Sequence, residues 1–401
     1  MKILLLTPIY PNKKDKTDTP VVHYFAKEWV KQGHEVVVIH CVANFYKIIY
    51  IIVGLFKKFL EKKIGTGIRI EPINSEVCVI DNVNVKRIPL VRFIPHTRYS
   101  KRQIGYAVAE ILSYCKKQNF NPDVLAYHWI NPQAEIVHSL KAHFNVPICY
   151  VAHDGGNDFK RLYKDEYRSF FSDIDLIGYR CKAIKDQMEK RFSDLNKPYF
   201  YCYSGVPEGY IDKNEEKHAF DKLNTIIYVG LLIKRKNPLA IMEAAQLAYQ
   251  DKEFSITYIG SGTEMDVMQK MIDKEGLERQ VKLLGRVARD EVIKEMKRNE
   301  IFVMISRGET FGLVYLEAMA KGCITVASYN EGFDGIIQHG INGFLCDAGD
   351  VNGLANVLRQ IRSLSMEDID KISFNAMETA RRYTDCNVAR DYVGELELLI
   401  R

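Results

Sequence analysis

The sequence predicts an α/β protein built on parallel sheets. Residues 301–327 read as a short buried strand, a loop, a helix with apolar residues at helical spacing, and a second buried strand. This order is the crossover unit of a parallel sheet. The first forty residues repeat it, with strands at 3–6 and 35–40 around a helix that ends near Gly33. The opening is therefore typical of a doubly wound sheet.

Length and composition favour two domains in a reducing compartment. The 401 residues suit two α/β domains of about 200 residues each. We expect an N-terminal domain over 1–205, a polar linker over 206–222, a C-terminal domain over 223–384 and a final amphipathic helix over 385–401. The nine cysteines form no Cys-x-x-Cys, which argues against a disulfide framework or a zinc site. The opening apolar run is too short for a signal peptide.

The loop before the helix of the central stretch is the first candidate site. Thr310, Phe311, Gly312 and Leu313 bring free backbone N–H groups to the helix start, which suits an anionic oxygen. The loop lies at the carboxyl end of its strand, where open α/β sheets bind ligands. Two carboxylates flank these N–H groups.

Those carboxylates are Glu309, in the loop, and Glu317, on the second helical turn. Glu317 interrupts an apolar stripe, so its carboxylate needs a partner or a ligand. Lys321, four residues on, is one candidate partner. The alternative is that Glu317 accepts hydrogen bonds from ribose or sugar hydroxyls.

A run of cations follows the strand at 225–230. Lys234, Arg235 and Lys236 precede a helix that begins at Pro238. Cations on a loop at a strand end suit a diphosphate, although a run of charge can also be a solvated face.

Other strand ends carry further candidates. Gly260 and Gly262 follow the next strand and would allow the backbone to approach a ligand closely, and Arg286 leads out of the strand after it. His153 ends an earlier strand before two glycines, where it would point into a ligand site unless turn backbone satisfies it. Asp173-Ile174-Asp175 resembles a metal-binding D-x-D, but 368–370 matches it equally well, so we predict no metal site.

The region 44–102 holds twelve basic and four acidic residues, a charge of +8 against +5 for the whole chain. Such a region favours an anionic surface or partner. Within it an apolar stripe recurs at helical spacing, and lysines lie near its ends and on its other face. The stripe includes Phe45, Ile49, Ile52 and Phe56, and the lysines are Lys57, Lys58, Lys62 and Lys63.

The uninterrupted apolar run of this segment, 48–56, is too short to span a bilayer. The pattern predicts a helix that lies in a lipid interface, and the alternative is a core helix with solvated lysines. Residues 86–102 form a second basic segment, which we predict to be a loop on the same side.

Taken in order, these segments resemble the retaining glycosyltransferases of family 4. The resemblance covers nearly the whole chain. It rests on Ile3-Leu4-Leu5-Leu6-Thr7-Pro8, Gly33-His34-Glu35-Val36, His153, the segment 230–237, Gly260-Ser261-Gly262, Leu284-Gly285, the E-x7-E element from Glu309 to Glu317, and Gly340-Ile341-Asn342-Gly343.

The resemblance implies the α/β fold called GT-B, in which two Rossmann-like domains face each other across a cleft and the C-terminal helix crosses back to the N-terminal domain. The N-terminal domain would bind the acceptor, and the C-terminal domain would bind a nucleotide-sugar. Glu317 would then bind the ribose hydroxyls and Glu309 the hydroxyls of the donor sugar. Backbone N–H groups of Phe311, Gly312 and Leu313 would face the sugar and the diphosphate.

The resemblance also assigns charge. Arg235 and Lys236 would neutralise the diphosphate, and His153 would lie near the reacting carbon. The full set expected to bind the donor is Gly230, Arg235, Lys236, Gly260, Gly262, Arg286, Thr310, Phe311, Gly312, Leu313 and Glu317, and the catalytic residues expected are His153 and Glu309.

The chain departs from the family pattern at three places. Leu231 stands where an Arg is common after the first glycine of the phosphate loop, and Arg235 beside Lys236 would replace that charge. Asp18-Thr19-Pro20 stands where many members have Gly-Gly. Near Gly335 many members have a Glu; we expect a helix over 335–339 here and assign the position no role.

The function implied is transfer of a sugar, with retention, from a UDP- or GDP-linked donor to a growing surface glycan. The acceptor would be a lipid-linked oligosaccharide, capsule, exopolysaccharide or lipopolysaccharide on a lipid carrier, with the enzyme peripheral on the cytoplasmic face of the membrane. No cofactor, metal or nucleic acid is expected, and the oligomeric state is left open. The alternatives are a UDP-sugar 2-epimerase and a catalytically silent nucleotide-sugar binding protein.

Overall fold

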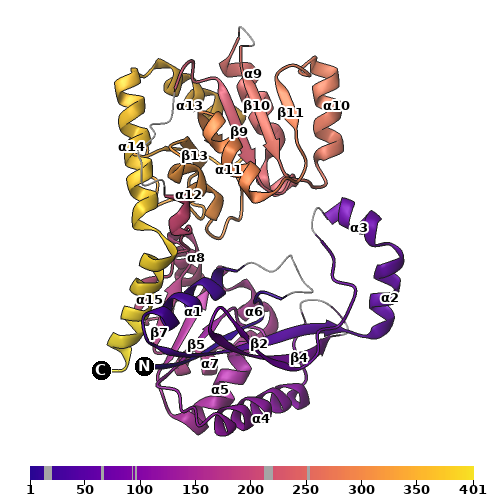
Figure 1. The fold of residues 1–401 in the computed structure, drawn as a ribbon, viewed down its shortest axis with the longest axis vertical. Helices are drawn as coiled ribbons and strands as arrows, with labels where there is room; N and C mark the ends of the chain where they lie inside the picture. Colours follow the sequence, from indigo (N-terminus) through magenta and orange to yellow (C-terminus); the bar gives the residue numbers. More distant parts are fainter. Residues whose placement is uncertain (13–19, 65–66, 93, 95–96, 212–219, 251–252) are drawn as a thin grey trace.

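The computed structural model describes residues 1–12, 20–64, 67–92, 94, 97–211, 220–250 and 253–401, apart from the side chains of 58 and 62–64. Asp18, Thr19 and residues 212–219 of the predicted linker at 206–222 lie outside these ranges. The chain forms two lobes that are joined along one edge by α14 (Met366–Arg382) and α15 (Asp385–Leu399) (Figure 1). The exact domain boundaries stay a prediction.

The N-terminal lobe is built on a sheet with strand order β3-β4-β2-β1-β5-β6-β7-β8, counting only described residues. All neighbours are parallel except β3 and β4. Its strands are β1 (Lys2–Thr7), β2 (Glu35–Phe45), β3 (Glu76–Ile80), β4 (Val83–Arg92), β5 (Val124–His128), β6 (Ile148–Ala152), β7 (Leu176–Tyr179) and β8 (Tyr199–Tyr201). The central strands are buried on both faces, because helices cover both sides of a parallel sheet.

The C-terminal lobe is built on a parallel sheet with strand order β11-β10-β9-β12-β13-β14 among its described residues. Its strands are β9 (Thr225–Val229), β10 (Ser255–Ile259), β11 (Val281–Leu283), β12 (Ile301–Val303), β13 (Ile324–Ser328) and β14 (Phe344–Cys346). The carboxyl ends of β9 and β12, which are neighbours in this sheet, bring the loops after them together.

Helices flank both sheets. In the N-terminal lobe they are α1 (Val21–Lys31), α2 (Lys47–Leu55), α3 (Lys57–Ile64), α4 (Lys101–Lys117), α5 (Gln133–Phe144), α6 (Asn157–Tyr163), η1 (Lys164–Glu166), α7 (Tyr167–Asp173) and α8 (Lys182–Arg191), and η2 (Glu208–Tyr210) follows them. In the C-terminal lobe they are η3 (Lys234–Lys236), α9 (Pro238–Ala248), α10 (Met265–Glu275), α11 (Arg289–Arg298), α12 (Leu313–Ala320), α13 (Val351–Ser363) and α14.

The last helix, α15, crosses back to the N-terminal lobe as predicted. It packs against α1: Trp29 Nε1 donates a hydrogen bond to the carbonyl of Ala389 at 2.9 Å, and the Trp29 and Tyr392 rings meet edge-to-face at 4.9 Å. The chain leaves the N-terminal lobe near Val206 and returns to it at the start of α15. These two segments lie side by side, since the amide of Asp385 donates a hydrogen bond to the carbonyl of Val206 at 2.9 Å. The chain therefore passes between the lobes twice at one place.

Two sequence predictions are wrong. Residues 86–102, predicted as a loop, instead contribute to β4 and open α4. β4 is the neighbour of β2 over nine residue pairs, and its charges hid the strand pattern. Arg87 is 2% exposed and pairs with Glu76 at 2.6 Å, and Lys86 pairs with Glu110 at 2.7 Å, so part of the predicted basic segment is neutralised within the lobe.

The helix predicted near 335–339 is also absent from these described residues. The segment forms turns and isolated bridges, Asp334 with Ile337 and His339 with Gly343. Gly335 has a φ of +97°, a left-handed value that ends any helical run.

Candidate functional site

The loop between β12 and α12 is shaped by a left-handed glycine. Gly312 is the N-cap of α12 with a φ of +83°, and a Cβ there would lie 2.4 Å from the Tyr315 ring. Tyr315 is fixed in turn, since its hydroxyl donates to the carbonyl of Met304 at 2.6 Å. The turn brings Thr310, Phe311 and Leu313 to the helix start, where the first amides of a helix have no intrahelical acceptor. The predicted group of N–H donors is therefore assembled at one place.

Glu309 does not stand alone in this loop. Its Oε2 pairs with Lys236 Nζ from η3 and accepts a hydrogen bond from Ser306 Oγ at 3.2 Å. Both charged side chains are about nine-tenths buried, with 10% exposure for Lys236 and 12% for Glu309. Burial lowers the pKa of Lys236, and the attraction of Glu309 opposes that shift. In the described part of the chain, no partner is recorded for the second carboxylate oxygen of Glu309.

Arg235 lies beside this pair and has a different environment. Its side chain is exposed, and its Nη1 donates to the carbonyl of Gly308 at 3.2 Å. Its own carbonyl accepts from the amide of Arg307 at 2.7 Å. The segments 234–237 and 305–309 are thus tied together by backbone and side chain, and Arg235 keeps a charge that no carboxylate of the described residues neutralises.

The glycines after β9 and β10 face each other. A Cβ on Gly260 would lie 1.8 Å from the carbonyl oxygen of Gly230, and one on Gly262 would lie 2.2 Å from that of Leu232. The close approach predicted for Gly260 and Gly262 is therefore made to neighbouring backbone, which corrects the reason we gave for them. Arg286 donates from Nε to Ser261 Oγ at 3.1 Å and holds the same turn.

Glu317 finds an ionic partner far away in sequence. It pairs with Arg289 Nη2, at the start of α11, rather than with the neighbour considered from the sequence. Burial raises the pKa of Glu317, and Arg289 pulls it back down. Arg289 also lies over the Tyr210 ring at 5.0 Å. Lys321, the alternative partner, donates to the carbonyl of Tyr210 at 2.6 Å.

His153 comes from the other lobe, at the end of β6. Its Nε2 shares a hydrogen bond with His128 Nδ1 at 2.9 Å, and its ring stacks on Trp129 at 3.7 Å. Burial, with Arg180 and His128 nearby, holds the pKa of His153 well below its ordinary value, so the ring is neutral at neutral pH. Thr310 Oγ1 donates to the carbonyl of His153 at 3.4 Å. This contact joins the two candidate loops across the lobe boundary.

Two residues of this region escaped the sequence interpretation. Arg289 is the first, and Glu331 is the second, because its carboxylate accepts from the amide of Glu309 at 2.8 Å. Gly332, the next residue in the chain, packs tightly against the loop before α12: a Cβ on Gly332 would lie 2.6 Å from the backbone nitrogen of Phe311. Arg289 follows β11 and Glu331 follows β13, so both lie after the carboxyl ends of strands in the C-terminal sheet. That position is the signal that could have identified them.

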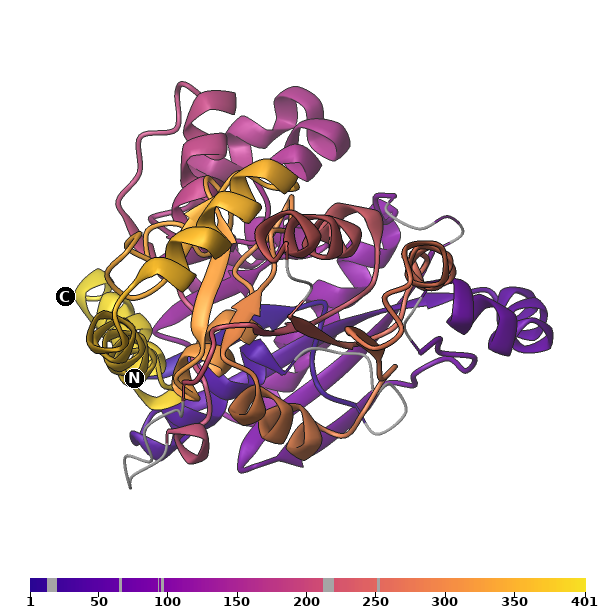
Figure 2. The ribbon, with the colours of Figure 1, turned by 90° about the horizontal axis from the view of Figure 1, so that it is seen from above.

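The segment 45–63 is arranged differently from our prediction. Phe45 ends β2 instead of opening a helix, and the rest divides into α2 and α3. Both helices project from the body of the molecule (Figures 1 and 2). Their apolar side chains are exposed, led by Leu55 at 78%, Phe59 at 66% and Ile51 at 61%.

Of the stripe residues, Ile52 is 51% and Phe56 57% exposed, whereas Ile49 is half-buried. Lys57 reaches Glu61 at 3.8 Å. The side chains of Lys58, Lys62 and Lys63 lie outside the described residues. A core-packed helix, the alternative from the sequence, does not fit these exposures.

Taken together, the loops at the C-terminal sheet edge hold the exposed Arg235, the start of α12 and two ion pairs, Lys236 with Glu309 and Arg289 with Glu317. Such a set can bind a diphosphate through Arg235 and the helix start, and polyhydroxylated rings through Glu309 and Glu317. In the described ranges no group of three or more His, Cys, Asp or Glu side chains is placed to hold a metal ion. Whether the chemistry is independent of metal stays a prediction.

Comparison with known proteins defines the class. Residues 211–378 match the family model described as glycosyl transferases group 1. Sucrose-phosphate synthase from Thermosynechococcus elongatus aligns over 100% of this chain and 99% of its own, with a TM-score of 0.71 and 14% identity. Anabaena HepE in complex with UDP aligns over 100% of both chains, with a TM-score of 0.68 and 18% identity. The fold is therefore GT-B, as predicted.

Two relatives align over most of their length. N-acetyl-alpha-D-glucosaminyl L-malate synthase of Bacillus anthracis is 28% identical over 66% of this chain and 70% of its own. Alpha-monoglucosyldiacylglycerol synthase of Acholeplasma laidlawii is 29% identical over 72% of this chain and 70% of its own. The chain carries a glycosyl transferases group 1 domain, and with the GT-B fold this makes the protein a glycosyltransferase.

Proposed function

We propose that the protein is a retaining transferase of family 4 that moves a sugar from a UDP- or GDP-linked donor to a growing surface glycan on a lipid carrier. One observation carries this proposal. Lys236, Arg235 and the open amides of α12 converge on one loop, which also holds Glu309. A nucleotide diphosphate linked to a sugar offers this loop both a group that needs positive charge and a ring that needs acceptors.

The arrangement suits departure of the diphosphate. Cleavage of the bond to the anomeric carbon leaves negative charge on the diphosphate and positive charge on the sugar ring. Arg235 and the amides at the start of α12 are placed to stabilise the first charge. Lys236 adds to this, but its pairing with Glu309 reduces its net contribution.

The carboxylates suit the hydroxyl groups of the donor. Lys236 and Ser306 engage one oxygen of Glu309 and orient the other toward a ligand. Arg289 likewise holds one oxygen of Glu317. We assign Glu309 to the donor sugar and Glu317 to the ribose, because an oriented carboxylate discriminates hydroxyls strongly.

Retention is supported by the character of His153, which we assign to the surroundings of the reacting carbon. His153 is neutral and stacked, so it neither adds positive charge nor attacks as a carboxylate would. A direct reaction, in which the acceptor enters on the side that the diphosphate leaves, needs no protein nucleophile. His153 and Thr310 then shape the meeting point of the two lobes.

For the donor base, uridine has the better support. The structural neighbour from Anabaena was solved with UDP, with UDP and glucose, and with UDP-glucose. At 18–19% identity this neighbour supports the fold and makes uridine the first nucleotide to test.

For the acceptor, α2 and α3 support a site of action at a membrane surface. Their exposed apolar side chains, from Ile48 to Phe59, follow one another along the chain instead of being scattered, and Lys47 and Lys57 open the two helices. A relative named for synthesis of a glucosyldiacylglycerol points the same way. No helix of the described residues is long and apolar enough to cross a bilayer. We therefore infer peripheral attachment on the cytoplasmic face.

The central test is donor turnover. Incubation with UDP- and GDP-sugars, with and without lipid-linked acceptors, should release nucleotide, and NMR of the product should show the anomeric configuration of the donor. Binding of no nucleotide diphosphate, or an inverted product, would contradict the proposal.

The membrane arm is tested separately. Ile52→Ser with Phe56→Ser should abolish flotation with anionic vesicles, because each change removes apolar area from the exposed face. The matched control is Val77→Ser with Val79→Ser on β3, where the side chains are 57% and 64% exposed. Equal flotation of the two double variants would remove α2 from the membrane contact.

A further inference from the structure

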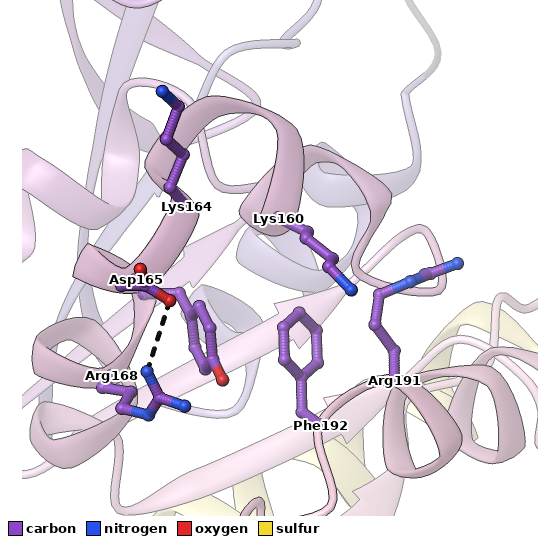
Figure 3. A pocket seen from close by; sticks show the side chains of 7 residues that line it. Lys160, Lys164, Asp165, Arg168, Arg191 and Phe192 are labelled. Carbon is purple, nitrogen blue, oxygen red and sulfur yellow. Dashed lines mark hydrogen bonds and ion pairs between the residues drawn. The ribbon is translucent and has the colours of Figure 1, made fainter.

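A basic cavity lies in the N-terminal lobe, apart from the donor loops. Its volume is about 370 Å³, and it opens between α6, η1, α7 and the end of α8 (Figure 3). It is lined by Lys160, Lys164, Asp165, Tyr167, Arg168, Arg191 and Phe192. None of these residues belongs to the donor set described above.

The charges around this cavity are not balanced. Four of the lining residues are cations and only Asp165 is acidic. Arg168 reaches Asp165 and Asp194, each at 3.4 Å. Lys160 and Lys164 form no ion pair with any residue that the structure describes. Like charges gathered around one cavity repel, and an anion of charge −2 or more would offset that repulsion.

The floor of the cavity is aromatic. The Tyr167 and Phe192 rings lie 4.7 Å apart, and the Arg168 guanidinium lies 5.0 Å from the centre of the Tyr167 ring. Figure 3 shows Lys160 reaching over Phe192 on the side of Arg191. A concave, partly apolar floor with cations on its rim suits a small molecule that carries phosphate on an organic body.

Lys164 has an unusual backbone. Its φ of 46° and ψ of −120° lie in a region that favours glycine and is costly for a lysine. Such strain is often retained where a side chain serves a ligand. Here it directs the chain from α6 into η1 and leaves the lysine stem on the cavity wall.

The cavity is also linked to the candidate active site. Arg191 donates from Nη1 to the carbonyl of Gly155, two residues after His153. The other side of this turn receives Thr310 from the C-terminal lobe. An anion that draws Arg191 toward the cavity would loosen its hold on Gly155 and so shift the His153 turn.

We propose that this cavity is a second ligand site, which binds a small phosphate-bearing molecule and acts on the His153 turn through Arg191. The binding part stands on the cavity alone. The effect on turnover rests on the proposed transferase function, so the two parts are measured separately.

The first experiment measures binding of inorganic pyrophosphate by calorimetry, without donor. Arg235→Gln serves as the background, because it removes the exposed cation that we assign to the diphosphate. In that background, Lys160→Gln with Lys164→Gln should weaken binding about tenfold or more, a loss that corresponds to about 1.4 kcal/mol.

The matched control is Lys116→Gln with Lys117→Gln at the end of α4, which removes the same net charge elsewhere. It should leave the pyrophosphate affinity unchanged. Equal affinity in the pocket variant and this control would overturn the proposal.

A second measurement uses the wild-type side chains. Amine acylation followed by mass spectrometry should show that pyrophosphate protects Lys160 and Lys164 but not Lys116. Uniform labelling of all three lysines in saturating pyrophosphate would contradict the site even if every variant folds well.

Lys164→Gly separates a ligand role from a structural one. Glycine accepts the left-handed backbone, so thermal stability should rise slightly while pyrophosphate affinity falls. A variant that loses stability and keeps full affinity would show that the lysine serves the fold and not a ligand.

The last arms identify the source of the phosphate and its effect. Phosphatidylcholine vesicles that contain phosphatidic acid are compared with pyrophosphate. Pocket-dependent binding to the vesicles alone would place the phosphate on a lipid headgroup, and binding of pyrophosphate would favour a soluble ligand.

The effect on catalysis is measured with donor turnover. The rate should change when pyrophosphate is added to the enzyme with Arg191, and Arg191→Gln should lose that response. A response that persists in Arg191→Gln would refute the coupling.

Discussion

The two lobes meet through loops that differ in their electrostatic character. The C-terminal edge contributes ion pairs, with Lys236 on Glu309 and Arg289 on Glu317. The N-terminal edge contributes His153, which is uncharged and stacked on Trp129. The comparison teaches that ion pairs lie where a diphosphate would leave, whereas a neutral ring lies where an acceptor would approach, with the Arg180 cation nearby.

The strongest way to break this comparison is to remove the buried cation. Lys236→Met should lower kcat at least a hundredfold, because Glu309 is left buried without its partner and the donor loop loses a positive charge. Donor turnover at saturating donor measures the effect. Lys234→Met removes an exposed cation from the same short helix and should change kcat less than about threefold.

Glu317 should matter for binding more than for chemistry. Glu317→Ala should raise the KM of the donor about tenfold, since a charged hydrogen bond is worth about 1.5–3 kcal/mol. Steady-state kinetics with the ribonucleotide donor tests this, and a donor with a 2′-deoxyribose should show a smaller difference. Unchanged donor kinetics would remove Glu317 from the site.

The N-terminal side of the comparison predicts a flat pH response. Burial holds the pKa of His153 well below its ordinary value, so the charge of this ring should not change around neutral pH. The profile of kcat/KM should show no inflection that His153→Asn removes. An inflection near pH 6.5 that disappears in this variant would show that His153 carries a proton in the reaction.

The smallest effect is expected at the lobe crossing. Burial and the nearby Glu28 raise the pKa of Asp385 from its ordinary value of 3.8 to about 7. The folded state therefore holds this proton more tightly than the unfolded state. The associated stability is present at pH values below the unfolded pKa and is lost as the pH rises through 7.

Asp385→Asn imitates the protonated form. Its Tm should exceed that of the wild type by a few degrees, roughly 2–4 °C, at pH 8, and the gain should vanish near pH 4. Asp391→Asn, on the exposed face of α15, is the control. Equal gains for both variants at pH 8 would mean that general charge, and not Asp385, sets the dependence.

Most of the fold could be predicted from the sequence, because buried parallel strands are continuous apolar runs and glycines mark the loops that bound them. β4 was missed since its lysine and arginine residues look like a solvated loop until Glu76 and Glu110 are known to face them. The break at Phe45 was missed because β2 runs on beside β4 as far as Arg92. Strand length depends on its neighbour, and sequence periodicity does not report it.

The site was only partly accessible. Placement after strand ends gathered Arg235, Lys236 and Glu309 correctly at one edge, because parallel strands share a direction. The partner of Glu317 could not be foreseen, since Arg289 lies 28 residues away and reaches it only through the packing of α11. The i,i+4 spacing on a helix suggested Lys321 as the partner, but Glu317 pairs with Arg289 in the folded protein.

The position of α15 has a consequence for biosynthesis. Residues such as Ala389, Tyr392 and Leu396 complete the core around β1, although almost the entire chain separates them from it. A ribosome delivers the amino-terminal strands first, so this half must wait with an unfilled groove until residues 385–399 emerge. Nascent chains halted before that point should expose Trp29 to solvent quenchers and recruit chaperones.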